Sequence, residues 1–269
     1  MSNTSNDYAI KGISSVGEQL YLNEETADFH FICKSADGKD ERIPVHKLLL
    51  GSVSDVFRAM FSDSWKDKVD VVITDATVAE FEEFLQFFYL TRAKLTMDNI
   101  AKVLYLGDKY NVTECMDTCT KFLRRTITEN NVCWCYALAV LHHQDDLIRY
   151  CELMIAENTK AVFSSTSFLE CSKEVLGHIL GMDSLSCSEV EVFKAIIEWV
   201  KKASGENELT REIVQTHLGE LFFKIRYRSM TFENFAALDP LYGGLFTLDE
   251  YREIVQLNAT TQVKSHTHA

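Results

Sequence analysis

Hydrophobic residues near the start of the chain recur at steps of three or four, which is the spacing of one helical face. These residues are Ile10, Ile13, Val16 and Leu20. The pattern predicts an amphipathic helix over residues 10–20. Such a helix can pack on its own core or on a neighbouring molecule, and periodicity alone favours the core.

The next stretch has the period of a strand. Apolar side chains alternate over residues 29–33 and again over 43–45, and Asp37-Gly38 between them is a strong tight-turn signal. The sequence therefore predicts a β-hairpin. Pro44 donates no backbone hydrogen bond, so we expect the second strand at a sheet edge.

Helix and strand patterns then alternate once more. The spacing from His46 to Phe61 predicts one helix, and residues 69–73 alternate as a strand. Thr77 and Glu80 have the spacing of a capping box, in which both side chains satisfy free amides of the first helical turn. The helix after this box is predicted to bury a stripe formed by Phe81, Phe84, Leu85 and Phe88.

The rest of the chain is predicted to be helical almost throughout, and no Gly/Ser linker divides it. Ser188 and Glu191 form a second capping box, and Gly205 follows the basic end of the same helix. The predicted division is a domain over residues 10–127, a helical domain over 128–258, and flexible polar ends at 1–9 and 259–269.

Composition narrows the class of protein. Hydrophobic residues make up 46% and charged residues 25%, as in ordinary globular proteins. The 40 acidic residues against 27 Lys and Arg give a net charge of −13, which repels phosphate, so we expect no nucleic-acid partner. No run of about 18 apolar residues predicts a membrane span, and the first residues lack the pattern of a secretory signal. We therefore expect the eight cysteines to be reduced in the cytoplasm, with the nucleus as a second compartment.

The sequence lacks the common catalytic and phosphate-binding motifs GxxxxGK[ST], GxGxxG, GxSxG and HExxH. The strongest metal candidate is "CWCYALAVLHH", which holds Cys133, Cys135, His142 and His143. On one continuous helix the two thiols point about 200° apart, which does not suit a zinc knuckle. We interpret them as buried thiols beside surface imidazoles, and we expect no catalytic residue, no metal and no cofactor.

Several separated stretches resemble the BTB (POZ) family. They are "ADFHFIC" with Asp28, "HKLLL" with His46-Lys47, "FFYLTRAKLT" and "GDKYNV". Gly107 stands where the family usually has alanine, and "YLTR" replaces its "YTG". These matches imply an α+β domain in which a small sheet is flanked by helices.

The second half is similar to the BACK domain that follows BTB in many adaptors. "EVEVFKAIIEWVKKA" and "LFFKIRYRSMTFENFAAL" carry its pattern, and "GGLFTLDEYREIV" resembles its end in the BTBD-type subgroup. The two resemblances together cover about residues 10–258. They imply a BTB domain followed by an all-α BACK domain.

The resemblance also implies a docking site for cullin-3, the scaffold of a ubiquitin ligase. Many BTB proteins recruit it through a Φ-x-E motif between the third BTB helix and the next strand. "FSDSWKD" places Trp65 at Φ and Asp67 at the acidic position, one methylene shorter than glutamate. By the same resemblance Phe61, Tyr110 and Asn111 face the cullin. The alternative is that Trp65 folds back on its own domain.

A homodimer is the second implication, because BTB domains usually pair through the N-terminal helix. Ile13, Val16 and Leu20 then become a dimer face instead of a core face. Asp28 and Lys47 resemble the charged positions of the dimer pocket. For these two, an internal ion pair that fixes the start of a helix is the alternative.

The sequence thus indicates a non-enzymatic adaptor that homodimerises, docks cullin-3 and brings an unknown protein substrate to a ubiquitin ligase. One rival is a BTB oligomerisation module without a cullin role, as in transcriptional or scaffold proteins. The other is a catalytic protein, for which no constellation is found. Kelch repeats, a MATH domain and a PHR-type sandwich are all missing. We therefore expect either a fragment of a longer protein or target recognition through BACK or another partner.

Overall fold

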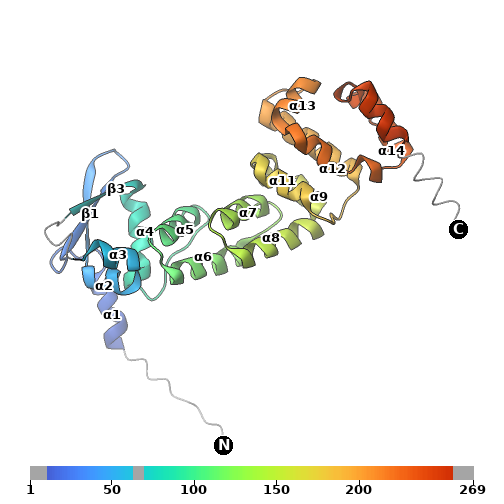
Figure 1. Cartoon of the computed structure of the whole chain (residues 1–269). Helices are drawn as coiled ribbons and strands as arrows, with labels where there is room; N and C mark the ends of the chain where they lie inside the picture. The colour runs from blue at the N-terminus through green and yellow to red at the C-terminus, as the bar shows by residue number, and fades with distance from the viewer. Residues whose placement is uncertain (1–10, 63–69, 257–269) are drawn as a thin grey trace, which may run out of the picture. The chain divides into compact units, whose positions relative to one another are not determined.

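The computed structural model describes residues 11–62 and 70–256 of the chain (Figure 1). Contacts between residues divide the chain into two compact units, the first ending at Arg125 and the second beginning at Thr126. The first unit combines a sheet with helices, and the second is helical in its described part. The predicted fold class, an α+β unit followed by an all-α unit, is confirmed.

The sheet of the first unit has three strands in the order β2-β1-β3 (Figure 1). They are β1 (Phe29–Lys34), β2 (Asp40–Val45) and β3 (Asp70–Thr77). β1 and β2 are antiparallel and form the predicted hairpin, with Gly38 at φ 81° in its turn. β3 is parallel to β1. Pro44 lies in β2, an outer strand of the sheet, as its missing donor requires.

Aromatic rings form the core between the sheet and its helices. Phe31 of β1 lies 5.6 Å from Phe57 and 5.0 Å from Phe81, centroid to centroid. Phe81 belongs to α4 (Val78–Tyr89), whose predicted stripe of Phe81, Phe84, Leu85 and Phe88 is buried. Thr77 and Glu80 form the predicted capping box at its start. Edge-to-face packing of such rings fixes α4 against the sheet.

The single helix predicted from His46 to Phe61 is wrong, because the structure contains two helices there. They are α2 (Lys47–Val53) and α3 (Asp55–Met60). Ser54 between them has extended backbone angles and is fully buried. Its hydroxyl accepts from the Phe57 amide at 3.1 Å and donates to the Tyr110 carbonyl at 2.5 Å. A serine that caps a new helix ends the previous one, although hydrophobic spacing continues across it.

The remaining helices of the first unit are α1 (Lys11–Leu20), α5 (Ile100–Lys109) and α6 (Thr113–Thr126). α1 confirms the predicted N-terminal helix. Asn111 joins α5 to α6 with φ at 50°, a left-handed conformation that asparagine tolerates better than most residues. A hydrogen bond from the Val112 amide to the Gly107 carbonyl at 2.8 Å closes this corner between α5 and α6.

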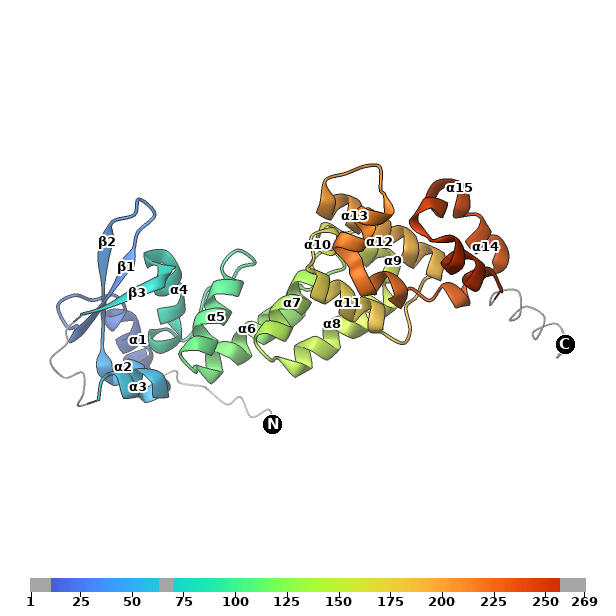
Figure 2. The same cartoon turned by 45° about the horizontal axis from the view of Figure 1, so that its top comes forward.

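The second unit confirms the prediction of helices almost throughout. Its first two helices, α7 (Val132–Leu141) and α8 (Asp145–Glu157), lie side by side (Figure 2). The others are α9 (Thr159–Phe163), α10 (Thr166–Leu169), α11 (Lys173–Gly181), α12 (Glu189–Ser204), α13 (Arg211–Leu218), η2 (Gly219–Lys224), η3 (Tyr227–Ser229), α14 (Phe232–Ala236), α15 (Asp239–Tyr242), η4 (Gly243–Leu245) and a helix over residues 248–256. The predicted capping box at Ser188 and the left-handed Gly205 both bound α12.

The thiols of α7 lie in the core. Cys133 and Cys135 are fully buried, and burial raises the pKa of both thiols to about 12. The expectation of two surface imidazoles is wrong in part, because His142 is 4% exposed while His143 is exposed. Across residues 11–62 and 70–256 no group of three His, Cys, Asp or Glu is arranged to hold a metal. No helix of these same residues is long and apolar enough to cross a membrane.

Candidate docking surfaces of the first unit

The predicted aromatic–acid pair lies outside the described residues. Trp65 and Asp67 both fall within residues 63–69, and the side chain of Ile13 is also outside the described set. The structure does describe the residues that bound 63–69 on each side. Those flanking residues, and not the motif itself, supply the geometry of the candidate surface.

On the upstream side, Phe61 is held by aromatic packing. Its half-buried ring lies 5.0 Å from Phe29 and stacks at 6.0 Å on Phe57. Its amide donates to the Phe57 carbonyl at 2.9 Å, and the Ser62 amide donates to the Ala59 carbonyl at 3.2 Å. The chain therefore leaves α3 from a fixed position, with part of the Phe61 ring still accessible.

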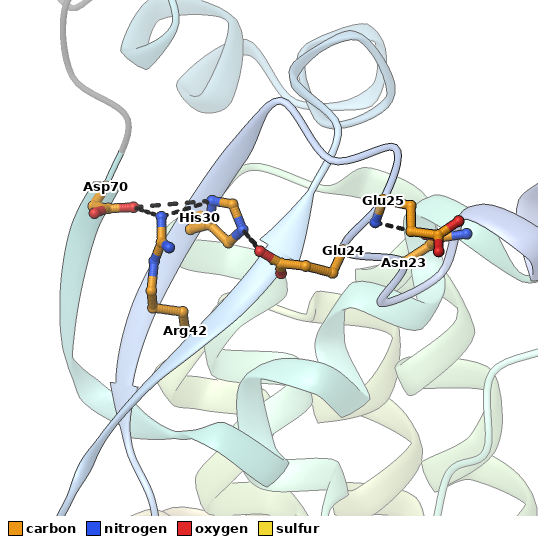
Figure 3. A network of polar contacts seen from close by, with 6 residues as sticks. All are labelled: Asn23, Glu24, Glu25, His30, Arg42 and Asp70. Carbon is orange, nitrogen blue, oxygen red and sulfur yellow. Dashed lines mark hydrogen bonds and ion pairs between the residues drawn. The ribbon is translucent and has the colours of Figure 1, made fainter.

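On the downstream side, a polar network holds Asp70 to the sheet (Figure 3). Arg42 donates to the Asp70 carboxylate at 2.8 Å and to His30 Nδ1 at 3.1 Å. Because Nδ1 accepts, the imidazole proton is on Nε2, which donates to Glu24 at 2.9 Å. Side chains from β1, β2 and β3 thus tie the start of β3 in place. Both ends of the segment that carries Trp65 are fixed.

Tyr110 is a core residue, so its predicted contact with a partner is withdrawn. It is 2% exposed, and its ring stacks on Phe57 at 4.4 Å and on Phe84 at 5.6 Å. Burial raises the pKa of its hydroxyl above the usual range. Asn111, the next residue, is exposed at the corner between α5 and α6 and remains available. Within the family-like "KYNV" sequence, Tyr110 therefore belongs to the core and Asn111 to the surface.

Asp28 and Lys47 are brought together, but not as an ion pair of side chains. The Asp28 carboxylate accepts from the backbone amide of Lys47 at 2.8 Å, which caps the first residue of α2. The Lys47 ammonium lies 5.1 Å from the centre of the Phe29 ring, a cation–π distance. The alternative prediction was an internal ion pair that fixes the start of a helix. Asp28 does hold the start of α2, but it binds the backbone amide of Lys47 and not its ammonium.

The N-terminal helix α1 packs on α4 through a face that the sequence pattern did not indicate. A Cβ atom on Gly17 would lie 1.9 Å from the Tyr89 carbonyl oxygen, so only glycine allows this approach. Tyr21 donates to the Glu82 carbonyl at 2.8 Å, and burial raises its pKa to about 12. Val16 remains 47% exposed. A glycine inside a helical pattern was the available signal.

Leu48 is a surface residue that sequence reasoning missed. It lies in the second position of α2 and is 81% exposed, whereas Leu50 two residues on is fully buried. Leu20 in α1 is half-buried. The first unit therefore offers apolar surface on α1 and α2, beside the capped Lys47. A leucine outside the buried stripe of its helix was the signal in the sequence.

An ionic cluster ties β3 to α5. Lys109 donates to both Asp75 oxygens at 2.8 Å, Tyr105 donates to the same carboxylate at 2.5 Å, and Lys102 reaches the Asp75 carbonyl at 2.9 Å. Burial alone would raise the pKa of Asp75, but the hydrogen bonds from Lys109 and Tyr105 outweigh it and lower that pKa. This carboxylate is saturated within the unit and is no candidate for partner binding.

Comparison with known proteins agrees with this architecture. The family model described as BTB/POZ domain matches residues 18–127, and the model described as BTB And C-terminal Kelch, or BACK, matches residues 132–237. The chain is a BTB–BACK protein.

Similar proteins carry BTB names. BTB/POZ domain-containing protein 3 of Homo sapiens is 28% identical over 238 residues, and BTB/POZ domain-containing protein 6 of Xenopus tropicalis is 30% identical over 238. In both cases the alignment covers 87% of this chain and 45% of the relative. The chain thus spans less than half the length of these relatives. Among solved structures, the BTB domain of human Gigaxonin matches 45% of this chain and 96% of its own, with 20% identity and a TM-score of 0.35.

Proposed function

We propose that this BTB–BACK protein is a non-enzymatic, homodimeric adaptor that docks cullin-3 and brings protein substrates to a ubiquitin ligase in the cytoplasm. The observation that supports it most is the segment between Phe61 and Asp70. It carries an aromatic residue and a carboxylate at the spacing of the family's docking motif, and both of its ends are held within a BTB unit. A segment whose two ends are already held loses less conformational entropy when it binds a partner.

The proposed cullin surface consists of Trp65, Asp67, Phe61 and Asn111. Trp65 would supply buried area as a central anchor, and such residues contribute most of the energy of an interface. Asp67 would meet a basic side chain or helix amides of the cullin. Phe61 adds the exposed part of its ring, and Asn111 adds a polar contact from the corner between α5 and α6.

The proposed dimer face consists of Ile13, Val16 and Leu20 on α1, with Asp28 and Lys47 at the start of α2. The exposure of Val16 supports this assignment over a place in the core. Leu48, which is 81% exposed next to Lys47, is added to the face. If a second copy covered Leu48, burial of its apolar surface would stabilise the dimer.

A second candidate function is a BTB oligomerisation module without a cullin role. One observation favours it: Asp67 stands where the family's motif has glutamate, and its carboxylate reaches one methylene less far. Direct titration separates the two functions. Under the adaptor proposal the purified chain binds the N-terminal region of cullin-3, and under the alternative it dimerises but does not bind.

The test is calorimetric titration of the cullin-3 N-terminal region into wild type and into Trp65→Ala with Asp67→Lys. Loss of a central aromatic costs about 2–4 kcal/mol, roughly 30- to 1000-fold in affinity. The matched control is Asp249→Lys, which makes the same charge change at a side chain that is 96% exposed in the second unit. Undiminished binding by the double variant removes this site from the proposal. Lost binding together with a collapsed melting temperature shows that Trp65 is structural.

A further inference from the structure

A cavity of about 500 Å³ lies within the second unit, between residues 222–229 and residues 246–254. This volume is in the range of sites that hold a small ligand or a few side chains. Its second wall lies beyond residue 237, where the match to the BACK model ends. The cavity is therefore built from the BACK region together with the segment that follows it, shown in red in Figure 2.

The floor of the cavity is aromatic and closely packed. Among the lining rings, Phe246 lies 5.4 Å from Phe222 and 5.4 Å from Tyr227, centroid to centroid. Phe235, which does not line the cavity, packs against Phe246 at 5.5 Å. These four residues are buried, whereas Phe223 at the rim is 49% exposed. A rigid aromatic floor with an exposed aromatic beside it suits a bulky apolar side chain.

Arg211 fixes the second wall. Its guanidinium donates to the Leu245 carbonyl at 2.6 Å and to both oxygens of Glu250 at 2.7 and 2.8 Å. Glu250 also accepts from the Thr247 amide at 2.7 Å, which caps the helix over 248–256. The hydrogen bonds from Arg211 lower the pKa of Glu250. The negative charge of Glu250 is thus neutralised within the unit.

The charges that remain at the rim are mostly positive. Lys224 and Arg228 are exposed on the first wall, and Glu253 faces them from the second. Arg226 between them is held by Glu189 at 3.6 Å and by the Asp183 carbonyl at 3.3 Å. Arg228 and Glu253 pair at 3.3 Å, but both are 69% exposed, so this pair is weak. Three basic and two acidic residues thus line the cavity, a small positive excess in a chain of net charge −13.

We propose that this cavity binds an acidic peptide segment of a partner protein. One bulky apolar side chain of the peptide packs on the aromatic floor beside Phe223. Carboxylates of the peptide bind Lys224 and Arg228, and they replace the weak contact of Arg228 with Glu253. Charge complementarity selects the peptide, and burial of the apolar anchor supplies most of the affinity. The inference goes beyond the adaptor proposal, because it does not require the first unit to bind a cullin.

The test uses a phage library of random 12-residue peptides selected on the full chain. Enriched peptides should combine aspartate or glutamate with a Phe, Leu, Met or Trp. As fluorescent synthetic peptides, they should bind in anisotropy titrations with an affinity that falls as salt rises. Arg228→Glu and Phe223→Ser should each weaken binding by about tenfold or more.

Arg252→Glu is the matched control, since it makes the same charge change at a 64% exposed arginine outside the cavity lining. It should leave the affinity within about twofold of wild type, because Arg252 does not line the cavity. The proposal is overturned if no peptide is enriched, if the enriched peptides lack acidic residues, or if Arg228→Glu binds them as wild type does. If Phe223→Ser lowers the melting temperature, its loss of binding has a structural cause. The effect of Arg228→Glu on peptide affinity then tests the proposal alone.

Discussion

Replacing Gly17 by alanine has two opposite effects on stability: it favours the helix, but it introduces a clash with α4. Alanine stabilises an isolated helix by about 1 kcal/mol relative to glycine. In this protein, however, the new Cβ would lie 1.9 Å from the Tyr89 carbonyl oxygen and 3.0 Å from its carbon. Both are backbone atoms that cannot rotate away, so α1 must move off α4.

The magnitude follows from what that movement disturbs. Overpacking of this kind costs about 1–3 kcal/mol, and weakening the bond from Tyr21 to the Glu82 carbonyl costs about 1 kcal/mol more. After the gain in helix propensity is subtracted, we expect a net loss of about 1–3 kcal/mol. Because α1 carries Val16 and Leu20, the proposed dimer should also dissociate at higher protein concentration.

Urea unfolding followed by circular dichroism measures the loss, and light scattering across a dilution series measures the dimer. Gly181→Ala is the matched control. A Cβ atom on this helical glycine of α11 would meet no neighbouring element within 4 Å, so the substitution should be neutral or stabilising. If Gly17→Ala is as stable as wild type, or more stable, the packing of α1 on α4 described above is wrong.

Three further substitutions test other parts of the structure. A Cβ on Gly107 would lie 2.8 Å from the Cys115 sulfur, so Gly107→Ala should cost about 1–3 kcal/mol in urea unfolding, and Cys115→Ala should recover part of that cost in the double variant. The pKa of Glu250 is lowered from 4.5, so its stabilisation is complete above that pH and is lost as pH falls through the lowered value. Thermal melts should therefore show Glu250→Gln about 1–2 kcal/mol less stable than wild type near pH 7, a difference that shrinks below pH 4.5. Leu48→Asp should halve the mass seen by light scattering with little change in melting temperature, because this leucine is 81% exposed; a variant that stays dimeric would exclude Leu48 from the interface.

Most elements of the fold were predictable because periodicity, turn residues and caps agree with one another. The break at Ser54 was not, since hydrophobic spacing runs through it and the buried serine is satisfied by Tyr110, 56 residues away in sequence. The contact expected for Tyr110 came from the family resemblance, which does not reveal that its ring packs between Phe57 and Phe84 in the core. His142 was expected at the surface because its imidazole is polar, but it is 4% exposed.

One departure from the family pattern has a physical cause in the core. Gly107, where the family usually has alanine, is explained by Cys115, whose sulfur occupies the space of a methyl group. Leu48 belongs to the run "LLL", in which Leu48 is exposed and Leu50 is buried, so composition alone does not distinguish them.

We propose a dimeric adaptor in which each copy presents one cullin site. The most direct measurement is the mass of the complex formed when the chain is mixed with an excess of the cullin-3 N-terminal region, by light scattering coupled to size exclusion. We expect a single species that contains two chains of 30.8 kDa and two cullin fragments. A chain that elutes separately from the cullin, at one or two copies, would contradict it.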